Sequence, residues 1–309
     1  MKKPELLITA GSCREIETYA ASGADAVQIG ENRYGVRMPG NFDIAGIKEA
    51  IQTAKQCGVR VYVSVHNLIP HERLDGLGDY LEKLAEWEAD AIIFGDPAVL
   101  VTLKERGLQM RLHWDGEMTA TNAETANFWK KHGAVRAVLA RELNLEEIKM
   151  FRKQTDMEIQ VQVHGITNIY HSMRRLVTSY MDHLGRHTPD MKYGAEQGLY
   201  LVEHERRGLK LPIFEDDAGT HIMSPDDICM IENLDELAEA EPDSLKIEGL
   251  LKTEQYNETV VRCYREAIDA LYSDPEHYEF DEQWLEKIEE LQPPGRELSY
   301  GFYYKEQVY

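Results

Sequence analysis

Short apolar segments rich in β-branched residues alternate with amphipathic helical segments along most of this chain of 309 residues. Eight apolar segments occur, at residues 5–9, 25–30, 60–65, 91–95, 111–114, 136–140, 158–164 and 244–248. Strands that alternate with helices predict a parallel sheet covered by helices, and eight such units are the number in a closed barrel. We therefore predict an α/β fold, a TIM-like (β/α)8 barrel.

Two segments interrupt this alternation. The loop at 31–42 is long for a strand-to-helix connection, and such loops are usually functional or disordered. The second interruption, between the seventh and eighth strands, predicts the following elements: a helix at 169–183, a β pair at 198–205 and 212–214, and a capped helix from Ser224 to about residue 239.

The domain organisation follows from these interruptions. We predict a barrel formed by residues 1–165 plus 243–275, with a subdomain at 166–242 inserted over its top. Residues 276–309 form a C-terminal extension, which we expect to dock on the barrel through the aromatic cluster at 301–304.

Charge and cysteine content limit the partners and the compartment. The net charge of −21 repels phosphate backbones, so any action on nucleic acid needs a local basic patch or a second subunit. The longest apolar runs are strand-sized, too short to span a bilayer, and the first residues lack the apolar region of a signal peptide. Four scattered cysteines suit a reducing compartment, so we predict a cytoplasmic protein.

The carboxyl ends of the predicted strands carry the candidate site, because barrels of this kind hold their active sites there. The catalytic candidates lie at or just past a strand's end and are Arg141, Glu142, His164 and Glu248. The substrate-binding candidates are Glu31, Arg33, Tyr34, Arg37, His66, Asn67, His113 and Lys246. Carboxylates, imidazoles and guanidinium groups that converge suit acid–base chemistry or anion binding.

We hypothesise that this site binds a small anionic metabolite or a flipped-out base. Arg141 and Lys246 would neutralise its charge. Glu142, Glu248 and His164 would position the ligand or move protons. Side chains that point into the helix layer would contradict this hypothesis. His183 and His187 have the i,i+4 spacing of metal ligands, but the sequence has no HExxH motif and we predict no metal site.

Six motifs resemble those of the collagenase-like U32 peptidase family, and the likeness runs the whole length of the chain. They are GADA at 23–26 with Ile29-Gly30, Tyr34-Gly35 and Arg37; LAREL at 139–143; VHG at 163–165; IMSPDD at 222–227; LKIEG at 245–249; and Gly301-Phe302. Within the family, the sequence is most similar to short bacterial members that are paired with a longer paralogue.

The resemblance implies a part in tRNA hydroxylation, which forms 5-hydroxyuridine at the wobble position, in a hetero-oligomer with a longer paralogue. It implies that tRNA is contacted through that complex. Other members act in ubiquinone biosynthesis or are described as collagenases. Two alternatives therefore stay open: a collagenase-like peptidase, and a non-catalytic pseudoenzyme subunit that binds its partner.

The resemblance also bears on cofactors. Longer members hold an iron–sulfur cluster with cysteines after the VHG motif, but Asn168 and Arg175 stand at the first of these positions here. Residues 188–193, where further ligands are expected, include no cysteine. Because such clusters need thiolates, we predict no cofactor in this chain and an iron–sulfur cluster on the partner paralogue.

Overall fold

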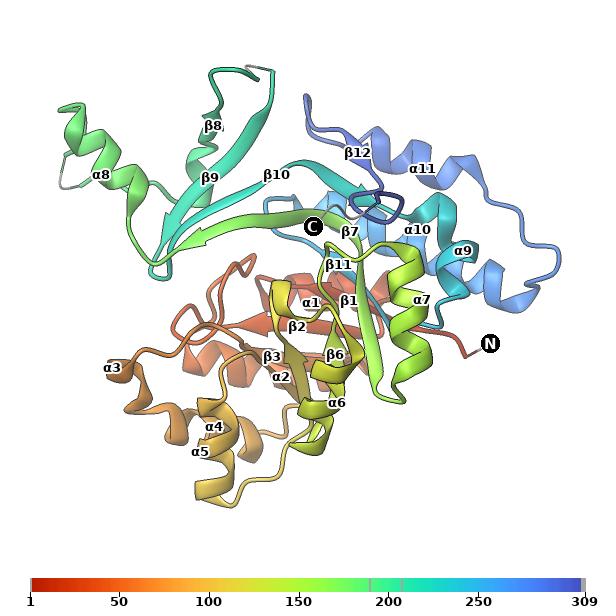
Figure 1. Ribbon diagram of the computed structural model, residues 1–309, viewed down its shortest axis with the longest axis horizontal. Helices are drawn as coiled ribbons and strands as arrows, with labels where there is room; N and C mark the ends of the chain where they lie inside the picture. Colours follow the sequence, from red (N-terminus) through yellow and green to blue (C-terminus); the bar gives the residue numbers. More distant parts are fainter. Residues whose placement is uncertain (1, 189, 207, 307–309) are drawn as a thin grey trace.

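The computed structural model describes residues 2–188, 190–206 and 208–306, and its core is a closed parallel barrel (Figure 1). The barrel strands are β1 (Glu5–Thr9), β2 (Ala26–Gly30), β3 (Arg60–Val65), β4 (Ala91–Phe94), β5 (Leu112–Asp115), β6 (Ala134–Val138), β7 (Glu158–Ser172) and β11 (Ser244–Glu248). Each pairs in parallel with the next, and β11 pairs with both β7 and β1, which closes the ring. The predicted TIM-like (β/α)8 fold is confirmed.

Helices follow the barrel strands along the chain and cover the outside of the ring. They are α1 (Cys13–Ala21), α2 (Ile44–Cys57), α3 (His71–Leu74), α4 (Leu77–Glu86), α5 (Ala98–Arg106), α6 (Ala123–Lys131), α7 (Leu145–Gln154) and α10 (Glu254–Ser273), with a 3-10 turn η1 at Glu117–Thr119. Local signals set several boundaries. Asn144 and Glu147 form the capping box of α7, and Gly58 ends α2 in the left-handed conformation.

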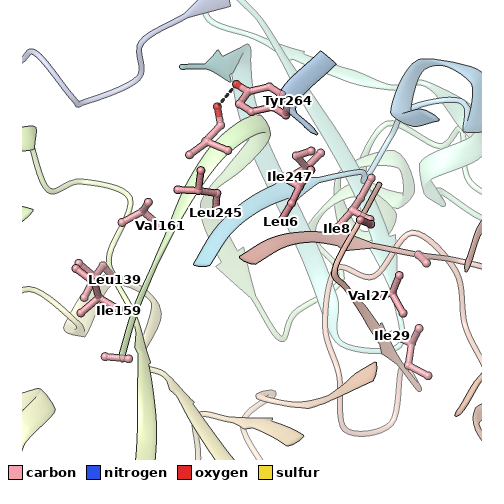
Figure 2. Close-up of a cluster of buried hydrophobic side chains, with 14 of the residues drawn as sticks. Leu6, Ile8, Val27, Ile29, Leu139, Ile159, Val161, Leu245, Ile247 and Tyr264 are labelled. Carbon is pink, nitrogen blue, oxygen red and sulfur yellow. Dashed lines mark hydrogen bonds between the residues drawn. The ribbon is translucent and has the colours of Figure 1, made fainter. Parts of the chain in front are cut away.

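Side chains on each strand alternate between the helix layer and the barrel interior. Figure 2 shows the outward set, which includes Leu6, Ile8 and Ile247 and packs under the helices. Leu7 points inward and joins Tyr62 in a small interior cluster. This alternation directs the side chains of Lys246 and Glu248, which flank Ile247, toward the inside.

A buried ion-pair network fills the amino-terminal end of the barrel. Glu5 accepts hydrogen bonds from Tyr62 Oη (2.5 Å) and Ser244 Oγ (2.9 Å), and it pairs with Arg136 (2.6 Å). Each of these buried polar groups has a partner, which offsets the cost of removing them from water. The candidate site lies at the opposite, carboxyl-terminal end of the barrel, where active sites of such barrels are found.

The segment after β7 differs from the sequence prediction. β7 continues to Ser172, so the predicted helix at 169–183 is wrong in its first half, and α8 covers only Leu176–His183. The helix predicted from Ser224 is also wrong, because β10 (Gly219–Cys229) runs through that motif and the helix α9 (Leu234–Ala238) begins later. Long antiparallel pairing between β7 and β10 outweighs the local helix signals.

We call residues 166–229 the arm, a sheet that projects from the barrel with α8 at its far end (Figure 1). β9 (Lys210–Asp216) pairs with β10 and with the edge strand β8 (Tyr200–Val202), so the predicted β pair is present. Glu215 fixes α8 to this sheet, because its carboxylate accepts hydrogen bonds from the backbone of Val177 (2.6 Å) and Thr178 (3.1 Å).

The C-terminal segment packs on both the barrel and the arm. It contains α11 (Glu282–Glu289) and β12 (Leu298–Ser299), and β12 pairs with β10. Tyr303 is buried and donates a hydrogen bond to the backbone oxygen of Gln162 (2.8 Å). Met1 and residues 307–309 of the predicted domains lie outside the described residues. Within the described residues, no helix is long and apolar enough to cross a membrane.

Candidate functional site at the barrel mouth

A cavity of about 50 Å³ lies at the carboxyl ends of the barrel strands. Five of the twelve predicted site residues line it: Arg37, His66, Arg141, Lys246 and Glu248. Four polar residues outside the predicted site set also line it: Gln28, Asp115, Glu117 and Gln162. Strand alternation could have indicated Gln28, Asp115 and Gln162 as inward positions, whereas Glu117 lies in the turn after β5.

Lys246 and Glu248 form the ion pair of this cavity. The distance from Lys246 Nζ to Glu248 Oε2 is 2.9 Å, and each side chain is nearly nine-tenths buried. Glu248 Oε1 also accepts a hydrogen bond from Thr9 Oγ1 (2.8 Å), which in turn accepts one from the backbone of Gly249 (2.8 Å). The carboxylate is therefore held in one orientation, with its ammonium partner on the cavity side.

A second ion pair crosses the mouth between Arg37, in the loop after β2, and Glu117, in the turn after β5. The Arg37 side chain is 8% exposed and that of Glu117 is 27% exposed. Burial, together with the nearby positive charge of Arg141, lowers the pKa of Arg37 to about 10. The cation still persists at neutral pH. Three positive groups (Arg37, Arg141 and Lys246) therefore line the mouth beside three carboxyl groups (Asp115, Glu117 and Glu248).

His66 supplies a neutral imidazole to the same cavity. Burial lowers its pKa to about 4, against the opposing effect of Asp115. Its Nδ1 has no hydrogen-bond partner among the described residues. At neutral pH this ring can therefore donate or accept a hydrogen bond to a ligand without adding charge.

His164 lies outside the mouth, contrary to the proposed catalytic role. Its Nε2 is 2.9 Å from Tyr256 Oη and its ring packs against Tyr264, both on α10 in the helix layer. The cause is a register shift in which Lys246 pairs with Gln162 but Ile247 pairs with His164. The extra residue in β7 turns His164 outward, as a β-bulge does.

The remaining predicted residues do not line the cavity. The ring of Tyr34 packs at a tilt against that of Tyr80 of α4, with centroids 4.7 Å apart, and Arg33 donates a hydrogen bond to the backbone oxygen of Asp75 (2.8 Å). These contacts fix the loop to the helix layer. Glu31 follows β2, and burial raises the pKa of its carboxyl group. Asn67 follows β3, and Glu142 lies in the turn after β6.

His113 occupies the barrel interior, one inward position before Asp115 on β5. It is fully buried and its ring meets Tyr62 edge-on at 4.6 Å. Burial holds its pKa well below the usual range. This packing makes His113 part of the barrel filling beneath the mouth, away from the binding surface predicted for it.

A wider groove of about 710 Å³ lies between the barrel rim and the arm. The barrel contributes residues 38–41 and 249–252, and the arm contributes Lys192, Tyr193 and Asp216 among others. Met38 lines both this groove and the inner cavity, so the loop that carries it separates the two spaces.

The arm also contains a pair of stacked histidines behind Asp216, which lines the groove. The rings of His171 and His221 are parallel within 2° and 4.8 Å apart. His221 Nε2 lies 2.9 Å from Asp216 Oδ1, and this pairing keeps the pKa of Asp216 below its usual value despite burial. Sequence reasoning missed the cluster because it assigned His171 to a helix.

The residues at the expected cluster positions do not fit an iron–sulfur cluster. Asn168 and Arg175 offer an amide and a guanidinium group, whereas such clusters need thiolates. Cys229 and Cys263 are buried, and burial raises the pKa of the Cys229 thiol to about 12. The described residues include no group of three or more His, Cys, Asp or Glu that could hold a metal ion. That this chain carries no cofactor stays a prediction.

A closed (β/α)8 barrel with a charged cavity at its strand ends defines a TIM-barrel protein. The chain belongs to Peptidase family U32, whose sequence profile matches residues 11–308. The family resemblance seen in the sequence motifs is thereby confirmed.

Three relatives illustrate the range of this family. The chain is 43% identical to "tRNA hydroxylation protein P2" of Bacillus subtilis (strain 168), over 100% of both proteins. It is 33% identical to "tRNA hydroxylation protein P1" of the same organism, over 100% of this chain and 74% of that protein. It is 25% identical to a "Collagenase" of Porphyromonas gingivalis (strain ATCC BAA-308 / W83), over 92% of this chain and 70% of that protein.

Proposed function

We propose that this chain acts in tRNA wobble-uridine hydroxylation, forming 5-hydroxyuridine together with a longer, cluster-bearing paralogue. The observation that carries the proposal is full-length similarity to a tRNA hydroxylation protein in a chain whose barrel mouth is built as a charged cavity. The reaction takes place on tRNA, so the proposal also places the chain in the cytoplasm.

The mouth cavity suits a small anionic metabolite. Arg37, Arg141 and Lys246 supply positive charge around one small space. Glu248 orients Lys246, and the neutral His66 ring offers a hydrogen bond. We assign His164 no role in ligand binding at the mouth, because its side chain lies under α10. A flipped-out base would instead enter through the wider groove.

A partner paralogue fits both the charge and the surface of the chain. Two tRNA hydroxylation proteins, P1 and P2, occur in one organism among the relatives. The net charge of −21 opposes binding of tRNA by this chain alone. The arm exposes large apolar residues, among them Tyr180 (61%), Leu201 (40%) and Val202 (48%), and apolar surface of this kind suits a protein partner.

Mass spectrometry of tRNA tests the proposal. Wobble uridines from cells that lack this chain should lose 5-hydroxyuridine, and wild-type chain supplied from a plasmid should restore it. Unchanged tRNA in the deletion strain would contradict the proposal. A parallel assay of the purified chain on denatured collagen tests the peptidase alternative, which gains support only if cleavage occurs.

A further inference from the structure

The inner cavity is narrow in this structure. Its volume of about 50 Å³ is comparable to one or two water molecules, so a metabolite cannot enter without movement of its walls. Met38 forms the partition toward the wide groove. Next to Met38, the Arg37 side chain reaches across the mouth to Glu117 and joins the two loops.

Both partners of this closing pair have unusual backbone conformations. Arg37 has φ of 54° and Glu117 has φ of 47°, in the left-handed region that residues other than glycine rarely adopt. The Glu117 turn is held by a hydrogen bond from its backbone N–H to Asp115 Oδ1 (3.0 Å). Backbone strain of this kind clusters at ligand clamps and switch regions.

The side chains of Arg37 and Glu117 differ in their exposure and in their hydrogen bonding. Arg37 is the fixed partner, since its side chain is 8% exposed, and its Nη1 atom has no hydrogen-bond acceptor within the described part of the chain. Glu117 is the more exposed partner, at 27%. A guanidinium group can donate hydrogen bonds to both oxygens of a carboxylate. The Nη1 atom of Arg37 can therefore donate a second hydrogen bond to an anion that is better placed than Glu117.

We infer that Glu117 is an internal competitor: its carboxylate occupies the Arg37 subsite until a small carboxylate-bearing anion displaces it and opens the mouth. The inference rests on the proposed anion site and adds the residue that controls entry. Neutral molecules cannot exchange with Glu117, so the same contact selects for charge. Arg141 and Lys246 then hold the part of the anion that Arg37 does not reach.

Calorimetric titration of the purified full-length chain with malonate tests this inference at constant ionic strength. Removing the competitor raises the fraction of open mouths, so Glu117→Gln should bind malonate roughly tenfold more tightly than wild type. Glu117→Asp, which retains the competing carboxylate, should stay near wild type. Glu124→Gln removes an exposed carboxylate from the start of α6 and serves as the charge-matched control.

Equal malonate affinity in wild type and Glu117→Gln would overturn the inference, and so would failure of Glu117→Gln to bind malonate. Thermal unfolding without malonate shows that each variant is folded. The titration needs no tRNA, so it separates the two proposals. Tighter binding by Glu117→Gln, with unchanged tRNA in the deletion strain, would support the competitor while contradicting the hydroxylation function.

Discussion

Lys246 Nζ lies 2.9 Å from Glu248 Oε2, two residues further along the same barrel strand, and both side chains are mostly buried. Two inward positions of one strand thus carry opposite charges at the mouth. Because Glu248 is also fixed by Thr9, the pair presents its ammonium group to the cavity in a defined place.

Breaking this pair should destabilise the chain. Lys246→Met leaves a mostly buried carboxylate without its cation, and we expect the free energy of unfolding to fall by roughly 2 kcal/mol. Adding Glu248→Gln should recover part of the loss, because the unpaired charge is removed. Urea unfolding of both single variants and the double variant measures the coupling. Strictly additive effects would contradict a direct pair.

His164 should contribute to pH-dependent stability. Burial lowers its pKa in the folded protein to about 3 from an ordinary value of 6.5, so the unfolded chain binds the proton first as pH falls. Stability is therefore complete above about pH 6.5 and declines toward pH 3, by at most about 1.4 kcal/mol per pH unit from this residue. Urea unfolding between pH 4 and 7 should show a shallower slope in His164→Gln.

The exposed His132 provides the control for that experiment. His132→Gln should keep the wild-type slope. If His164→Gln also keeps it, the buried imidazole is not a source of the acid sensitivity.

The C-terminal segment should depend on one buried carboxylate. Asp227 pairs with Lys252 and with Arg296 (2.6 Å), and although burial opposes ionisation, these cations bring its pKa to about 2. Arg296→Met should cost about 3 kcal/mol and speed amide hydrogen exchange across residues 290–306. Lys287→Met, on the exposed face of α11, should change neither.

The ion pairs of Asp227 also predict a loss of folding stability at low pH. The folded pKa of Asp227 is depressed, so its stabilisation is present above the ordinary carboxyl pKa near 4 and is lost as pH falls toward 2.

For the Arg296→Met experiment, amide exchange at 290–306 that is no faster than in wild type would show that the segment is held by other contacts.

The arm should carry the partner interface. Leu201→Lys combined with Val202→Lys places charge on the exposed strand β8 and should reduce recovery of the paralogue with the tagged chain by at least about tenfold. Val101→Lys alters an equally exposed valine on α5, away from the arm, and should leave recovery unchanged. Equal recovery of the paralogue with both variants would contradict an interface on β8.

Sequence patterns predicted the barrel well because strand alternation and helix caps are local signals. All eight strands begin within a few residues of their predicted positions, although β7 runs on to Ser172. The inward placement of Lys246 and Glu248 follows from the same alternation. Contacts distant in sequence caused the failures: β7–β10 pairing replaced a predicted helix, and one bulge turned His164 away from the mouth. Glu117 was missed because only the folded turn brings it to Arg37.

The central claim is that the charged mouth serves tRNA hydroxylation, and Arg141 tests it with little risk to folding because it lines the cavity from a turn. The measurement is 5-hydroxyuridine at the wobble position in a deletion strain that expresses Arg141→Gln or the exposed control Lys104→Gln at equal protein levels. We predict that Lys104→Gln restores the nucleoside as wild type does, whereas Arg141→Gln does not. Full restoration by Arg141→Gln would contradict the claim.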